Sequence, residues 1–201
     1  MSFWDMTAWG YDLFETVFNG KCYNTTGKCV AQDLEKTDRV LECACGTGSI
    51  TKYLAPACRE IVATDMSKEM LRKAAKNCRS SPNIRFCLAD ITSLRCRDEV
   101  FDKVVAGNVI HLLDDPEKAL RELMRVCKTG GKVIIPTYIN MEPGGGTSGL
   151  ITALDKAGAG FKRQFNAETY QEFFLSCGIE NVKFFTVGGK IPCRVAVITK
   201  E

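Results

Sequence analysis

Short apolar runs alternate with helical patterns along most of the chain, and this alternation limits the possible folds more than any other feature. The runs cover residues 40–43, 61–65, 84–89, 101–106 and 132–137. Each is bounded by turn residues and rich in aliphatic side chains, which is typical of a buried strand. Because the segments between the runs have helical patterns, the sequence predicts a parallel sheet with helices on both faces.

Capping residues indicate where the intervening helices begin. Residues 115–117 combine an N-cap aspartate, a proline and a glutamate, and they predict a helix that ends at Gly130. Ser67 is expected to cap a second helix over residues 68–79. A third helix is expected over residues 47–54, directly after a glycine turn.

The C-terminal part departs from this alternation. A helix is expected over residues 168–177, followed by strands over 182–187 and 194–199. No helix fits between the two strands, so they must pair antiparallel. The sequence therefore predicts a single α/β domain over residues 1–201 whose parallel sheet ends in a hairpin.

Charge and composition exclude several classes of partner. The net charge is +3 and no Lys/Arg block stands out, so we expect no nucleic acid partner. No apolar run approaches the roughly 20 residues of a membrane span, and the acidic N-terminus does not resemble a signal peptide. We expect the eleven cysteines to be reduced in the cytoplasm. We expect no metal site, because the cysteines are scattered and one histidine is present.

A glycine turn follows the first run, and residues 42–48 read Glu-Cys-Ala-Cys-Gly-Thr-Gly. In open parallel sheets, ligands bind beyond the carboxyl ends of the strands, where glycine lets the backbone approach them. A dinucleotide motif would have a third glycine, but Thr51 stands there. The carboxylate of Glu42 would repel a pyrophosphate and would suit a cationic amino group.

Two further acids end later strands. Asp65 follows the second run at a spacing that suits a ribose contact, and Asp90 is placed to accept a hydrogen bond from an adenine amino group. A ligand with an ammonium group, a ribose and an adenine but no phosphate is S-adenosylmethionine.

In these motifs the chain resembles the class I S-adenosylmethionine-dependent methyltransferases, in particular the small-molecule branch that includes quinone-biosynthesis enzymes. The resemblance rests on residues 40–48, 63–67, 88–91, 101–111 and 123–132. It implies a Rossmann-like sheet of seven strands in the order 3-2-1-4-5-7-6, with strand 7 antiparallel. It also implies S-adenosyl-L-methionine as cofactor and a small-molecule methyl acceptor.

The resemblance implies a set of cofactor-binding residues as well. Asp65 would bind the ribose hydroxyls, Asp90 would lie near the adenine amine, and Gly46 and Gly48 would lie under the methionine moiety. The other implied residues are Tyr11, Glu42, Ala44, Met66, Ile91 and Asn108. Ala44 stands where the family usually has glycine, which is tolerable unless the backbone there needs a positive φ.

The acceptor side is marked by one candidate residue and two candidate lids. His111, the sole histidine, follows the fourth run, and we expect it to be either buried and structural or catalytic and substrate-orienting. Residues 1–20 and 141–166 are expected to cover the site.

The expected reaction is methyl transfer to a thiol, a phenol or quinol, or an activated carbon. The enzyme would align the two reactants and exclude water. The alternatives are a nicotinamide-dependent oxidoreductase and a non-catalytic module that binds S-adenosylmethionine. No tyrosine has the lysine four residues on that short-chain dehydrogenases use, and residues 108–110 lack the Pro-Pro-aromatic motif of DNA amino-methyltransferases. The acceptor and the oligomeric state are not identified by the sequence.

Overall fold

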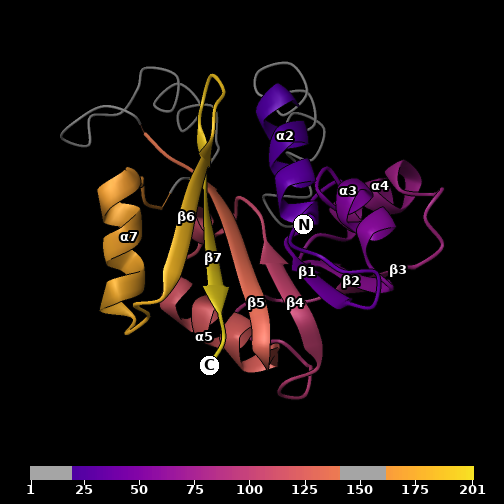
Figure 1. Cartoon of the computed structure of the whole chain (residues 1–201). Helices are drawn as coiled ribbons and strands as arrows, with labels where there is room; N and C mark the ends of the chain where they lie inside the picture. The colour runs from indigo at the N-terminus through magenta and orange to yellow at the C-terminus, as the bar shows by residue number, and fades with distance from the viewer. Residues whose placement is uncertain (1–19, 141–161) are drawn as a thin grey trace.

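The computed structural model describes residues 20–140 and 162–201, which form a seven-stranded sheet with helices on both faces (Figure 1). The described elements are, in chain order, α2 (Gly20–Ala31), β1 (Arg39–Cys43), α3 (Thr51–Leu54), η1 (Ala55–Ala57), β2 (Glu60–Asp65), α4 (Lys68–Asn77), β3 (Ile84–Leu88), β4 (Phe101–Ala106), η2 (Ile110–Leu112), α5 (Pro116–Val126), β5 (Cys127–Tyr138), α7 (Ala167–Ser176), β6 (Val182–Val187) and β7 (Cys193–Thr199). Within these residues, no helix is long and apolar enough to cross a membrane.

The strands lie in the order β3-β2-β1-β4-β5-β7-β6, which confirms the predicted topology. β1 pairs in parallel with β2 and with β4, and the parallel pairs β2–β3 and β4–β5 extend the sheet on both sides. β7 runs antiparallel to both β5 and β6, so the expected C-terminal hairpin is present.

Two helix boundaries differ from the prediction by more than two residues. The helix after the glycine turn covers only Thr51–Leu54, because Gly48 has a φ of +87°, which a right-handed helix cannot contain. α5 ends at Val126 and not near Gly130. The residues after it join the sheet: the amide of Gly130 donates to the Lys200 carbonyl at 2.7 Å, and a Cβ on Gly131 would lie 2.7 Å from the Asp102 carbonyl oxygen.

Helix α2 was not predicted, because its sequence is rich in residues of low helix propensity. Its buried face includes Tyr23, Gly27 and Val30. A Cβ on Gly27 would lie 2.5 Å from the ring of Tyr53, so glycine permits close packing of α2 on α3. Tertiary packing therefore stabilises a helix that its local sequence does not favour.

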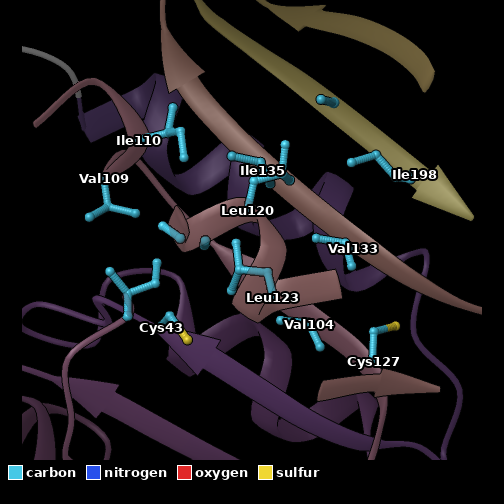
Figure 2. Packing of buried hydrophobic residues seen from close by; sticks show 14 of the residues in the cluster. Cys43, Val104, Val109, Ile110, Leu120, Leu123, Cys127, Val133, Ile135 and Ile198 are labelled. Carbon is cyan, nitrogen blue, oxygen red and sulfur yellow. The ribbon is translucent and has the colours of Figure 1, made fainter. Parts of the chain in front are cut away.

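The core has two main parts, one on each face of the sheet. Successive strand residues point to opposite faces, so Leu41 and Cys43 pack with α5 and α7, whereas Val40 packs with α2 and α3. Figure 2 shows the first part, in which Leu120 and Leu123 of α5 lie against strand residues such as Val104. Helices thus pack on both faces of the sheet, and the loops at the carboxyl ends of its parallel strands extend from this packed core.

Tyr170→Phe is expected to lower the free energy of unfolding by about 1 kcal/mol. The hydroxyl of the buried Tyr170 donates to the Ile135 carbonyl at 2.7 Å, which links α7 to β5. A phenylalanine keeps the ring packing against Phe165 and Phe174 but removes the hydrogen bond. Urea denaturation measures the change, and equal stability of both proteins would show that the bond contributes nothing.

Candidate functional site

The carboxyl ends of β1, β2 and β4 lie side by side at one edge of the sheet. Glu42 in β1 pairs with Ala63 on one side and with Val105 on the other. Asp65 ends β2 on one side of the glycine turn, and β4 ends at Ala106 on the other. The predicted convergence of the cofactor residues at this edge follows from the strand order.

Glu42 is a buried carboxyl group with one unsatisfied oxygen. Its side chain is 2% exposed, and Oε2 has no hydrogen-bond partner among the described residues. Burial raises the pKa of Glu42 from its ordinary value of 4.5 to about 8; Thr51 opposes the rise and the nearby Asp65 carboxylate adds to it. A cation at this position would pair with Oε2 and favour the ionised form.

Thr51 is a site residue that the sequence analysis did not single out. Its hydroxyl is buried beside Glu42, where hydrogen bonding to the carboxyl group opposes the rise in the Glu42 pKa, and it has no other hydrogen-bond partner within residues 20–140 and 162–201. The one signal in the sequence is a polar residue at the position of the third glycine in a dinucleotide motif. Two buried polar groups whose only neighbouring partner is each other indicate a place for a polar ligand atom.

Asp65 connects the glycine turn to the next helix. Its Oδ2 accepts from the amide of Gly46 at 2.9 Å, and its Oδ1 accepts from the amide of Ser67 at 2.9 Å. Ser67 in turn caps α4, as predicted, by accepting from the amide of Met70 at 3.2 Å. An ionised carboxylate has about four acceptor sites, so Asp65 can hold the turn and still accept from a ligand hydroxyl.

The glycine turn leaves open space above its backbone. Gly46 has a φ of +54°, and a Cβ built on it would meet no atom of the described residues within 4 Å. Gly48 has a φ of +87°, and there a Cβ would lie 2.8 Å from the sulfur of Cys78. Gly46 therefore provides room for a ligand, whereas Gly48 is needed for packing against α4.

Ala44 also has a positive φ, of 53°, so this position does need the conformation that glycine favours. The left-handed region is unfavourable for alanine by about 1–2 kcal/mol. A glycine at this position would remove this strain, but its larger unfolded-state entropy offsets about 0.4–1 kcal/mol of the stabilisation. Loss of the contacts of the partly buried methyl group offsets a further part of the stabilisation.

Ala44→Gly is therefore expected to stabilise the ligand-free protein by about 0.5 kcal/mol. Gly46→Ala is a matched control, because Gly46 has a similar φ and open space for a methyl group. It is expected to destabilise the protein by about 0.5–1 kcal/mol. Denaturant unfolding measures both variants, and a loss of stability in Ala44→Gly would contradict the strain at this position.

Three predicted residues lie along the rim beyond β2 and β3. Met66 is 59% exposed, which is unusual for a large apolar side chain. Asp90 is exposed, and its Oδ1 accepts from both the amide and the hydroxyl of Thr92 at 2.8 Å. Ile91 is buried in the core cluster of α5 and α7. At this rim, an apolar side chain such as Met66 could pack on the flat face of a nucleobase, and a carboxylate such as Asp90 could accept a hydrogen bond from its amino group.

The two residues predicted after β4 are both buried. The Asn108 side-chain oxygen accepts from the thiol of Cys193 at 3.9 Å. His111 is 3% exposed, and its Nδ1 lies 2.9 Å from the Thr137 hydroxyl. Burial lowers the pKa of His111 to about 3, so its imidazole is neutral at physiological pH. These properties suit a group that orients its neighbours better than a group that accepts a proton.

Several predictions lie outside the described residues. Tyr11, the first predicted lid and most of the second are among residues 1–19 and 141–161. In the part of the chain that the structure describes, no three His, Cys, Asp or Glu side chains are grouped to hold a metal ion. Cys43 and Cys45 lie in different core clusters.

Comparison with known proteins shows that part of the chain is similar to methyltransferases. Residues 41–135 match the family model described as a methyltransferase domain. The demethylmenaquinone methyltransferase of Renibacterium salmoninarum is 39% identical over 100 residues, which cover 50% of this chain and 41% of the relative. That of Streptomyces griseus is 32% identical over 136 residues, or 67% of this chain and 58% of the relative. The chain thus spans less than two thirds of these curated relatives.

Solved structures share the fold at low sequence identity. A chain from the complex between the Haloferax volcanii Trm112 methyltransferase activator and a methyltransferase has a TM-score of 0.81 at 16% identity, covering 100% of this chain and 99% of that one. The [4+2]-cyclase SpnF has a TM-score of 0.73 at 21% identity, covering 88% and 81%. Since a cyclase shares the fold, the fold by itself does not determine the reaction.

Proposed function

We propose that the chain carries a domain of the class I S-adenosylmethionine-dependent methyltransferase family and that it methylates a small-molecule acceptor. The observation that carries the proposal is the unsatisfied Oε2 of the buried Glu42 at the carboxyl end of β1. A buried carboxyl oxygen without a partner is costly, and a ligand that supplies a cation or a hydrogen-bond donor would satisfy it and favour the ionised form. The ammonium group of S-adenosylmethionine is such a ligand group.

The other residues of the edge fit the same cofactor. Asp65 has acceptor capacity for ribose hydroxyls, and Gly46 leaves room for the methionine moiety. The exposed Met66 and Asp90 suit an adenine. When bound, the cofactor supplies an activated sulfonium methyl group, and the task of this chain is to hold the reactants in line and exclude water.

We further propose that the acceptor ionises without a protein base. His111 is a poor base, since burial lowers its pKa to about 3. Acceptors with acidic protons, such as thiols, phenols, quinols and activated carbons, need little help of this kind. The similarity to demethylmenaquinone methyltransferases favours a phenol or quinol among them.

Two properties of the whole protein belong to the same proposal. Residues 1–20 and 141–166 would act as lids of a single domain over residues 1–201. All eleven cysteines are free thiols, which fits a reducing compartment such as the cytoplasm.

A screen with methyl-labelled S-adenosylmethionine tests this function. Thiols, phenols, quinols and active methylene compounds are offered separately, and labelled product and S-adenosylhomocysteine are measured together. We expect both to form in equal amounts with at least one class, and to fall sharply in Asp65→Ala. Tight binding of the cofactor with no turnover on any class would favour the non-catalytic module.

A further inference from the structure

Arg163 lies in a short segment that is fixed against the acceptor side of the sheet edge. The amides of Lys162 and Arg163 donate to the His111 carbonyl at 3.1 and 3.2 Å. Two residues later, Phe165 forms a bridge with Ile139, and its carbonyl accepts from the amide of Asn140 at 2.7 Å. Arg163 is therefore placed between η2, which follows β4, and the end of β5.

The side chain of Arg163 points inward. Lys162 and Gln164 are exposed, whereas Arg163 is half-buried and Phe165 is buried. This alternation is that of an extended segment, in which every second side chain lies on the same side. Arg163 thus shares the side of Phe165, which packs in the core cluster of α5 and α7.

The guanidinium of Arg163 lacks the partner that such a group requires. Its Nη1 is buried and has no hydrogen-bond partner among the described residues. The nearby carboxylate of Asp114 pairs with Lys162 at 3.0 Å. Two other arginines also have a buried nitrogen without a hydrogen bond, but Arg39 pairs with Glu60 and Arg194 donates to Thr186. Among these three arginines, only Arg163 has neither an ion pair nor a side-chain hydrogen bond within the described residues.

We propose that Arg163 binds a carboxylate of the methyl acceptor. A buried guanidinium nitrogen without a partner is unfavourable, and a carboxylate matches the planar donor fork of a guanidinium better than any neutral group. The position between the ends of β4 and β5 places this contact on the acceptor side of the edge, away from Asp65 and Asp90 beyond β2 and β3. This inference rests on the proposed function, since it names a substrate class for the same site.

Binding of benzoate and of its neutral analogue benzamide, both with S-adenosylhomocysteine present, tests the inference. Aromatic probes are chosen because the rings of His111 and Tyr138 lie 6.1 Å apart at this edge. Calorimetry or ligand-detected NMR is expected to show benzoate binding at least ten-fold more tightly than benzamide. Arg163→Met should lose this preference, and Arg163→Lys should keep part of it. Lys183→Met, which removes an exposed positive charge from β6, should behave as the wild type.

Two readouts keep this inference separate from the proposed function and from folding. Binding of S-adenosylhomocysteine reports on the proposed function and should be equal in all variants. The melting temperature of ligand-free Arg163→Met should be unchanged or higher, because the substitution removes a buried nitrogen that has no hydrogen-bond partner among the described residues. A lower melting temperature would indicate a structural role and overturn the inference. It would equally be overturned if wild-type protein showed no preference for benzoate, or if Arg163→Met retained it.

Discussion

Replacing Asp65 by alanine is expected to weaken binding of S-adenosylmethionine by about 10- to 150-fold, or about 1.5–3 kcal/mol. Hydrogen bonds to an ionised group are in this range, and the ribose hydroxyls would lose a charged acceptor. The same substitution frees the amides of Gly46 and Ser67, which Asp65 holds at 2.9 Å each. Loss of the ligand contact and loss of the turn geometry therefore act in the same direction.

Asp65→Asn separates these two effects. Asparagine keeps the shape and one acceptor oxygen, so the turn should be better preserved than in Asp65→Ala, and affinity should fall by a smaller factor. Asp115→Ala is the matched control, because Asp115 also accepts from a backbone amide, that of Lys118 at 2.8 Å, but it caps α5 and is not among the proposed cofactor residues, so affinity should be unchanged. Calorimetry with S-adenosylhomocysteine measures all three. An unchanged dissociation constant in folded Asp65→Ala would show that Asp65 only supports the turn and accepts no hydrogen bond from the ribose hydroxyls.

Glu42 is expected to make the stability of the ligand-free protein fall as pH rises from about 4.5 to about 8. Burial raises the pKa of Glu42 from 4.5 to about 8, so in this window the folded state binds a proton that the unfolded chain has lost. Stability falls with rising pH wherever the folded state binds more protons. The loss is of the order of a few kcal/mol, and Glu42→Gln should remove it. An identical pH dependence in both proteins would contradict the buried carboxyl group as its cause.

The same group should couple cofactor binding to proton release. At pH 7 the ligand-free Glu42 is mostly protonated, and an ammonium group beside it would favour the ionised form. Binding should therefore release up to about one proton. Calorimetry in buffers of different ionisation enthalpy measures the number of protons released on binding. The same titration of Glu42→Gln gives the number released by groups other than Glu42. Equal proton release in the two proteins would place the ammonium group elsewhere.

The parallel sheet, its terminal hairpin and the site edge were predictable from local patterns, whereas the order of the strands was implied by the resemblance to the methyltransferase family. The apolar runs, the caps at Ser67 and Asp115 and the short connection before β7 each determine an element by themselves. The order of the acids along the chain then places Glu42 and Asp65 at one edge, since parallel strands end there together.

The remaining features depend on tertiary contacts that no local pattern contains. α2 forms because its small residues pack on α3, and the chain after α5 enters the sheet because its amides find partners there. The positive φ of Ala44 is set by the turn as a whole. The unsatisfied atoms of Glu42, Thr51 and Arg163 follow from which neighbours surround them, so the most informative parts of the site required the structure.

The central claim is that the glycine turn holds an adenosyl amino acid and not a dinucleotide. Calorimetric titration of the wild-type protein with S-adenosylhomocysteine, and separately with NAD, tests it most directly. We expect S-adenosylhomocysteine to bind in the micromolar range, about −8 kcal/mol at 1 μM, with NAD much weaker. Tighter binding of NAD than of S-adenosylhomocysteine would contradict the account and favour a nicotinamide-dependent oxidoreductase.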